Sequence, residues 1–281
     1  MKHLLPPQGT ADTIVDRLLA YITPYDPDFS NLIQGASDKE ILEYCERAGF
    51  KTPGELPVSY HTFLKAMGTH DGFLFETCFV TMFNEFQLET GLDALWDMYT
   101  DGPVPGAQKN KYAYVADTIQ TMFYDTISLD RTSKTTEPRI VVTNFTYDEE
   151  AKNIRFHSQS WEHLVMQSAV LRVEPRRLPV VQWYERPVED HMIPFKAFKK
   201  EIDQLLDRLG LTLHWPSDAR YYIAISENIS LFIDIDLREM ICFTDTKELL
   251  QVVDTFAEKV NRVKGKRLKF REDGLLNKVK D

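Results

Sequence analysis

Two aspartates in a strand-like stretch are the residues of this sequence best placed for metal chemistry. Asp234 and Asp236 follow the apolar run Leu231 to Ile233, and residues two apart on a strand point to the same face. Two carboxylates on one face could hold a divalent cation, as in metal-dependent nucleases and transferases. The alternative is a half-exposed antiparallel strand, with Ile233 and Ile235 facing the core and both aspartates facing water. No third carboxylate follows at an obvious spacing, so the second interpretation is favoured and no metal ligand is assigned.

Histidines beside carboxylates are the next groups that could serve as acid and base. His70 and Asp71 stand together between two glycines, and His157, Glu162 and His163 flank a predicted strand end and helix start. Turn formation explains the first pair, and the spacing of the second set fits no standard metal site. The common nucleotide, hydrolase and protease motifs do not occur in the sequence. We therefore predict no catalytic residue, no metal, no cofactor and no enzymatic activity.

Acidic side chains form a third pattern, at four-residue steps in the first half of the chain. A helix over this segment would carry them on one negative face, where like charges destabilise the helix by about 0.2–0.5 kcal/mol per pair. A partner's Lys and Arg side chains could offset that repulsion, and a solvated helix face is the equal alternative. Asp148, Glu149 and Glu150 lie at a predicted turn further along the chain. The candidate partner-binding residues are Glu85, Glu89, Asp93, Asp97, Asp148, Glu149 and Glu150.

The distribution of charge points to a basic partner. The 281-residue chain has a net charge of −10, and residues 1–172 hold all of the excess, with 14 Lys and Arg against 24 Asp and Glu. An acidic domain repels nucleic acid and attracts basic proteins over a distance, an effect that salt screens. Solubility alone is the alternative explanation. Basic residues from position 264 onward predict a loosely ordered tail without the interleaved aromatic residues of a nucleic-acid site.

Composition places the chain among folded proteins of the cytosol. Apolar residues make up 43% of the sequence, which is enough for a core. No apolar run approaches the roughly 20 residues of a membrane span, and Pro6 and Pro7 interrupt any signal-peptide core. The three cysteines, Cys45, Cys78 and Cys242, are too few and too widely spaced for a disulfide framework, so we expect buried thiols.

The residue pattern of positions 1–172 predicts several helices, then antiparallel strands and a closing helix. Ser37 and Glu40 form a capping box that marks the start of one helix. Residues 73–86 are expected to be extended and 91–99 to form a short helix. The other predicted helices cover 10–22, 38–48, 57–67 and 160–171, and the predicted strands cover 112–116, 122–129, 139–145 and 154–157.

A second, smaller unit is predicted after a proline-rich connector. Four prolines with charged residues between them, in and next to residues 173–193, suit a segment that crosses the surface. The predicted unit then consists of helix 195–209, strands 211–215, 221–226, 229–236 and 238–243, and helix 246–263.

Short motifs in residues 1–172 resemble the SUKH superfamily. The core of the likeness is Leu56-Pro57-x-x-Tyr60-x-x-Phe63-Leu64, followed by a glycine turn. Val115-Ala116-Asp117, Phe123-Tyr124-Asp125, the strand 139–142 and Ser160-Trp161-Glu162-His163-Leu164 follow in the family's order. Thr118-Ile119-Gln120 stands where members usually carry glycines, and residues 190–281 resemble no family.

The resemblance implies an α+β fold, a mixed and mostly antiparallel sheet with helices around it, and no catalytic residue. Its members include immunity proteins that neutralise toxins, often nucleases, and eukaryotic regulatory scaffolds. We therefore expect a SUKH-like domain at 1–172, a connector at 173–193 and an α+β unit with a basic tail at 194–281. The expected function is neutralisation of a basic toxin by direct binding. The alternatives are a regulatory scaffold and a divalent-metal enzyme that uses Asp234 and Asp236.

Overall fold

The computed structural model describes most of the chain, which divides into two compact units. The acidic unit is Gly9–Ser168, with a net charge of −12, and the C-terminal unit is Met1–Gln8 with Ala169–Asp281, with a net charge of +2. The described residues are 5–6, 13–75, 79–81, 84–86, 88–90, 92, 111–118, 125–145, 151–185, 193–260, 262–270 and 276–278.

Helices fill the first half of the acidic unit, and two of them begin with capping boxes. Thr13 and Asp16 cap one, and Ser37 and Glu40 cap another, as predicted. The latter helix ends at Gly49, whose φ of 78° is the left-handed conformation of a helix C-cap. The helices are α1 (Ile14–Ile22), α2 (Phe29–Leu32), α3 (Asp38–Ala48), the short η1 (Pro53–Glu55) and α4 (Val58–Met67).

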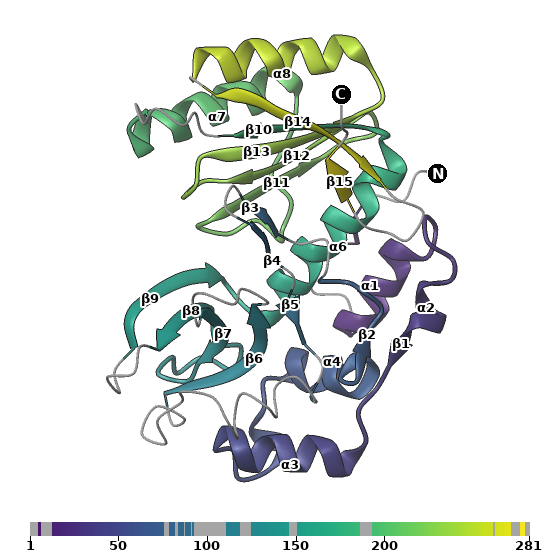
Figure 1. Cartoon of the computed structure of the whole chain (residues 1–281), viewed down its shortest axis with the longest axis vertical. Helices are drawn as coiled ribbons and strands as arrows, with labels where there is room; N and C mark the ends of the chain where they lie inside the picture. Colours follow the sequence, from purple (N-terminus) through teal and green to yellow (C-terminus); the bar gives the residue numbers. More distant parts are fainter. Residues whose placement is uncertain are drawn as a thin grey trace. The chain divides into compact units, whose positions relative to one another are not determined.

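The second half of the acidic unit is an antiparallel sheet with the strand order β5-β6-β7-β8-β9, as seen in Figure 1. Its strands are β5 (Leu88–Glu89), β6 (Tyr112–Thr118), β7 (Asp125–Asp130), β8 (Ile140–Phe145) and β9 (Ala151–Ser158). Two small sheets pair β1 (Ile33–Gln34) with β2 (His70–Asp71) and β3 (Phe79–Thr81) with β4 (Asn84–Phe86). The predicted α+β class and antiparallel pairing are confirmed.

An aromatic cluster forms the core of the acidic unit. Trp161 begins helix α6 (Trp161–Arg177), and its ring centroid lies 4.8 Å from that of Tyr60 and 5.0 Å from that of Phe63. Tyr44 and Phe75 complete the cluster, and all five side chains are fully buried. The Leu-Pro-x-x-Tyr-x-x-Phe-Leu motif therefore supplies core residues from α4.

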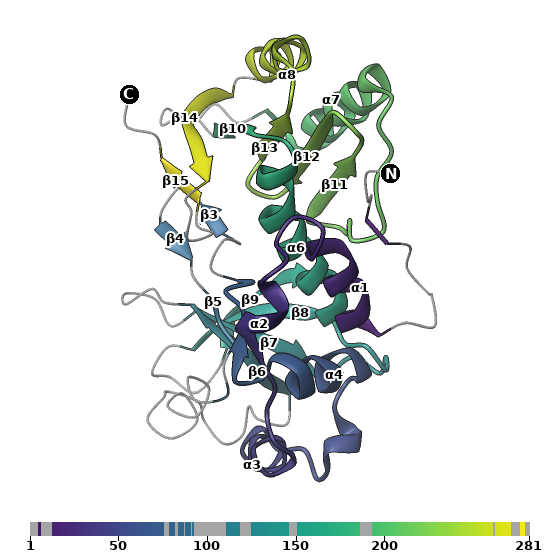
Figure 2. The same cartoon turned by 90° about the vertical axis from the view of Figure 1, so that its right-hand side faces the viewer.

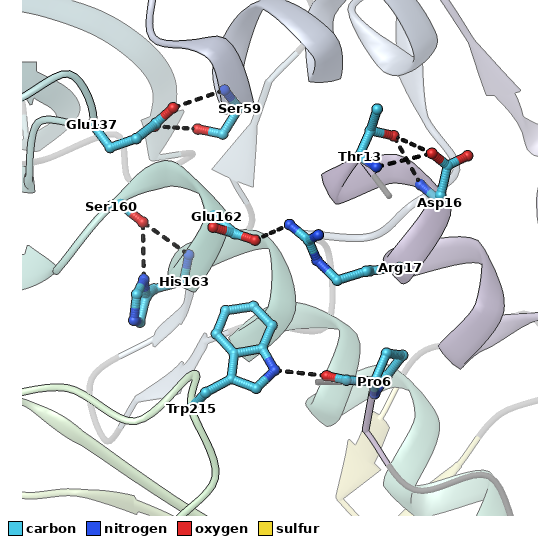
Figure 3. A network of polar contacts seen from close by, with 10 residues as sticks. All are labelled: Pro6, Thr13, Asp16, Arg17, Ser59, Glu137, Ser160, Glu162, His163 and Trp215. Carbon is cyan, nitrogen blue, oxygen red and sulfur yellow. Dashed lines mark hydrogen bonds and ion pairs between the residues drawn. The ribbon is translucent and has the colours of Figure 1, made fainter. Parts of the chain in front are cut away.

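The loop between β7 and β8 holds the ends of two helices. Arg131 donates hydrogen bonds to the carbonyl oxygens of Ala48 and Gly49 at the C-terminus of α3 (3.0 and 3.1 Å). The carboxylate of Glu137 accepts hydrogen bonds from the backbone N–H (3.0 Å) and the hydroxyl group of Ser59 in the first turn of α4. Figure 3 shows the second contact. The helix dipole favours a positive charge such as Arg131 at a helix C-terminus and a negative charge such as Glu137 at a helix N-terminus.

Asp130 organises the same loop. Its buried carboxylate accepts hydrogen bonds from Arg139 Nε (2.7 Å) and from the backbone N–H of Thr132 (3.0 Å). Burial by itself would raise the pKa of Asp130, but the hydrogen bonds from Thr132 and Arg139 outweigh it and lower the pKa below the ordinary value. The ionised carboxylate therefore stabilises this loop.

Replacing Asp130 with asparagine is expected to reduce the free energy of unfolding at pH 7 by about 2 kcal/mol, since a charge-assisted hydrogen bond contributes roughly 1.5–3 kcal/mol. The folded pKa lies below the unfolded value of about 3.9, so this stabilisation exists above that pH and disappears as the pH falls through the folded pKa. Urea unfolding of both proteins at pH 7 and pH 3 measures it. If the difference in free energy of unfolding between the two proteins is the same at both pH values, the ionised Asp130 carboxylate is not the source of the stability.

The C-terminal unit is a six-stranded antiparallel sheet with the order β11-β12-β13-β10-β14-β15. Helices α7 (Phe195–Leu209) and α8 (Lys247–Lys259) cover one face, and the C-terminal part of α6 lies on the other (Figures 1 and 2). Between sheet and helices lies a core that includes Phe198, Ile202, Leu231 and Val253. The strands are β10 (Val180–Glu185), β11 (Tyr221–Ile225), β12 (Ile229–Asp234), β13 (Glu239–Thr244), β14 (Val263–Phe270) and β15 (Leu276–Lys278).

The predicted connector and basic tail are wrong in part, because both contribute strands to this sheet. Within 173–193, α6 continues to Arg177 and β10 pairs with both β13 and β14. Val181, Trp183 and Tyr184 of β10 are buried, which a surface connector would not achieve. The tail forms β14, paired with β10, and the division between the units falls inside α6 after Ser168 instead of at residue 172.

The predicted strand at 211–215 is reduced to one bridge, between Leu213 and Ala224. The segment nevertheless covers the edge of β11: the His214 N–H donates to the carbonyl of Ile223 (2.8 Å), and the Ile223 N–H donates to the hydroxyl of Ser217 (2.9 Å). Coverage of this kind removes an edge that would otherwise pair with other chains.

Two further sequence predictions concern cysteines and membrane spans. Cys45 and Cys242 are free and buried, as expected, and burial raises the pKa of the Cys45 thiol to about 11. Cys78 lies outside the described residues. Among the helices that the structure describes, none has the length and apolar character needed to cross a bilayer.

Candidate functional site

The two aspartates with the strongest metal-binding pattern do not share a strand face. Strand β12 ends at Asp234, and Asp236 lies in the following turn, where it is exposed. Asp234 is only 8% exposed, so the prediction that both side chains face water is wrong for it. The reason is the pairing of β11 with β12, which sets Tyr221 opposite Asp234 and so brings the neighbouring Arg220 to the Asp234 carboxylate.

Asp234 uses both carboxylate oxygens within the fold. Oδ2 accepts hydrogen bonds from Nε and Nη2 of Arg220 (3.1 and 2.9 Å), while Oδ1 accepts from the backbone N–H groups of Asp236 and Leu237 (3.0 and 2.9 Å). These four bonds satisfy a nearly buried charge and close the β12–β13 turn. Among the described residues, no three His, Cys, Asp or Glu side chains are placed to share a metal ion.

His70 and Asp71 build a tight turn. The Gly72 N–H donates to His70 Nδ1 (3.0 Å), and the Leu74 N–H donates to Asp71 Oδ1 (3.2 Å). Thr90 donates its hydroxyl proton to Asp71 Oδ2 (2.7 Å). Burial nevertheless raises the pKa of Asp71 above its ordinary value. The pair therefore serves the turn chemistry that its sequence context favours.

The histidines around the start of α6 also have structural partners. Ser160 Oγ lies 2.9 Å from His163 Nδ1 and accepts a hydrogen bond from the His163 N–H (3.3 Å), while Glu162 forms an ion pair with Arg17 of α1. Figure 3 shows these contacts. His157 is buried in β9. Glu162 and His163 each engage a different neighbour, so they do not form the metal set considered from the sequence.

The predicted acidic helix face is wrong for its first two members. Glu85 lies in β4 opposite Val80, and Glu89 lies in β5 opposite Asp117. Strand-forming Phe, Val and Thr residues around them favour sheet pairing over a helix. The remaining candidates, Asp93, Asp97, Asp148, Glu149 and Glu150, lie outside the described residues.

The turn that follows His70 and Asp71 combines strain with an exposed aromatic ring. Gly72 and Phe73 have φ values of 68° and 61°, and the Leu74 N–H donates to the Asp71 carbonyl (3.3 Å), which is the geometry of a type I′ turn. The left-handed conformation costs about 1–2 kcal/mol for a residue with a side chain. The prediction of extended structure from residue 73 is therefore wrong at this turn, and the Asp-Gly dipeptide was the signal for it.

Phe73 belongs to a small surface region that includes α2. Phe73 is 38% exposed and its ring meets that of His70 edge-on at 4.7 Å, while Leu32 at the end of α2 is 39% exposed. Strand β1 follows Leu32 directly and pairs with β2, as Figure 1 shows. A Cβ on Gly72 would come within 2.7 Å of the Phe29 ring, so the turn lies against α2. The exposed apolar residues Leu32 and Phe73, with His70, are called the Phe73 patch.

The patch lies in the unit that carries the negative charge. Residues 23–38 and 68–75 together contain Asp26, Asp28, Asp38 and Asp71 but no Lys or Arg. Asp28 is exposed, and Asp38 forms an ion pair with Lys65 of α4. An exposed ring in a unit with excess negative charge suits a cationic side chain, since the face of an aromatic ring attracts cations. Comparisons of this chain with protein-family models, curated proteins and solved structures gave no match.

Proposed function

We propose that this protein is a non-catalytic binding module whose acidic unit docks onto a basic protein, and that it neutralises a toxin in this way. The observation that carries the proposal is the charge difference between the units, −12 against +2. A field of this size accelerates association with a partner of opposite charge. The SUKH-like motifs of the acidic unit support the immunity role, and a nuclease is a suitable target because nucleic-acid enzymes carry basic surfaces.

The roles of the polar side chains are consistent with this proposal. Asp234 closes a turn, His163 meets the cap of α6 and Asp71 holds the Phe73 turn. These three side chains thus have a role in local folding. The Leu-Pro motif likewise builds the core, which leaves the exterior as the working part.

A capture experiment tests the proposal directly. The tagged full chain is incubated at low salt with lysate of its source cells, eluted with a sodium chloride gradient and the partner identified by mass spectrometry. We expect a protein with a high isoelectric point whose coexpression is toxic without this chain. The Kd of the purified pair should rise at least about tenfold between 50 and 500 mM salt, because screening removes the long-range attraction. A partner that is acidic, or binding that salt leaves unchanged, contradicts the proposal.

Paired charge variants provide the control. Glu43→Gln with Glu46→Gln removes two charges from α3 of the acidic unit, and Glu248→Gln with Glu258→Gln removes two from α8 of the C-terminal unit. At low salt the first variant should associate severalfold more slowly and the second should associate like the wild type, since steering depends on charge near the docking unit. If the two variants slow association equally, the docking surface does not lie on the acidic unit.

Two alternatives make different predictions. A regulatory scaffold would recover several weaker partners, none of them toxic. A divalent-metal enzyme based on Asp234 and Asp236 would show heat of binding for magnesium or manganese that Asp234→Ala removes. The four hydrogen bonds to Asp234 disfavour this second alternative, because a metal would have to displace Arg220.

A further inference from the structure

We propose that the Phe73 patch is the contact at which the basic protein partner docks, with a partner Arg or Lys side chain seated on the Phe73 ring. This inference rests on the proposed function and specifies its surface. It has its own experiment, which can fail while the proposed function stands.

The backbone of Phe73 is the first observation behind the proposal. A left-handed φ of 61° suits glycine or asparagine, and both residues are common at this position of a type I′ turn. Phenylalanine strains the turn and leaves its ring 38% exposed. Strained residues gather at binding sites, where the surrounding structure holds them in place. Here the bonds from Gly72 to His70, from Leu74 to Asp71 and from Thr90 to Asp71 do so.

The chemistry around the ring determines the class of partner. Leu32 adds a second exposed apolar side chain, and aromatic anchors surrounded by apolar contacts dominate the energy of protein interfaces. The two segments that form the patch contain aspartates and no cationic residue. The Phe73 ring, in a unit with a net charge of −12, therefore matches a long cationic side chain, which offers a charge for the ring face and an aliphatic stem for apolar contact. An acidic partner or a nucleic acid would be repelled.

Phe73→Asn separates a binding role from a folding role. Asparagine accepts the left-handed backbone, so Tm should stay within about 2 °C of the wild type or rise. The Kd for the basic protein should increase at least about tenfold, as for an anchor residue of an interface. The matched control is Phe195→Asn, because Phe195 is 43% exposed but lies in the C-terminal unit. This control should not change the Kd.

Photo-crosslinking locates the docking surface even while the partner is unidentified. A benzoylphenylalanine is placed at position 73 in one protein and at position 195 in another, and both are irradiated in lysate of the source cells. A basic protein linked at position 73 alone, whose affinity falls in Phe73→Asn at unchanged Tm, supports the inference.

The remaining outcomes overturn the inference in distinguishable ways. If the basic protein binds but links at position 195, or binds Phe73→Asn normally, the patch is wrong and the proposed function survives. If Tm of Phe73→Asn falls by more than about 5 °C, the ring is needed for folding and the inference fails. If no basic protein links at either position and none is captured, both proposals fail.

Discussion

Replacing Trp161 with alanine is expected to reduce the free energy of unfolding of this protein by about 3–5 kcal/mol, the usual cost of removing a large aromatic side chain from a core. Trp161 is fully buried, and its ring meets those of Tyr60, Phe63 and Phe75 with centroid distances of 4.8, 5.0 and 5.7 Å. Alanine leaves a cavity between α4 and the start of α6. Because domains are stable by only about 5–15 kcal/mol, the variant should lose a large share of its stability.

Urea unfolding followed by circular dichroism at 222 nm measures this loss, since the substitution also removes a fluorophore. Trp161→Phe is the matched control. The indole N–H of Trp161 has no hydrogen-bond acceptor within the part of the chain that the structure describes, so phenylalanine removes an unsatisfied donor and retains most of the apolar contact. It should cost less than half as much as alanine. Equal losses for the two variants would contradict ring packing as the source of the stability, because phenylalanine retains most of the apolar contact.

Replacing Arg177 with methionine is expected to reduce the free energy of unfolding by about 3–5 kcal/mol, because the substitution removes the cation that pairs with the buried carboxylate of Glu174. Glu174 is fully buried, and Arg177 Nε lies 3.1 Å from each of its carboxylate oxygens. Arg177 also donates to the Glu227 carbonyl and the Ser230 hydroxyl, both at 2.8 Å. These bonds connect α6 to β12 and the turn before it inside the C-terminal unit.

The double variant Glu174→Gln with Arg177→Met tests the cause of the loss. When both charges are removed, no unpaired ion stays buried, so we expect at least half of the stability to return. Arg176→Met serves as the neighbouring control, since Arg176 donates to the Arg172 carbonyl of its own helix and should cost less than about 1 kcal/mol. Urea unfolding of the wild type, the single variants Glu174→Gln and Arg177→Met and the double variant gives the coupling energy. If the double variant is as unstable as Arg177→Met, the bonds to Glu227 and Ser230 are responsible.

The sequence by itself determined those features that depend on neighbouring residues. The capping box at Ser37 and Glu40 appears as predicted, because its bonds lie within four residues of chain. Helix α7 has the predicted limits, set by Pro194 before it and the left-handed Gly210 after it. Apolar periodicity likewise located the antiparallel strands β6 to β9 to within a few residues. The α+β class follows from the order of these elements.

Only the tertiary structure determined the conformation and burial of segments that depend on residues distant in sequence. Proline content made 173–193 look like a connector, yet β10 pairs with β13 and β14, strands that come more than 50 residues later. Asp234 is buried because Arg220 reaches it, and Phe73 is strained because bonds from Leu74 and Thr90 hold the turn. Sequence spacing describes the local backbone and the face of an element. Pairing, burial and strain arise only when remote residues meet, and the candidate docking surface depends on all three.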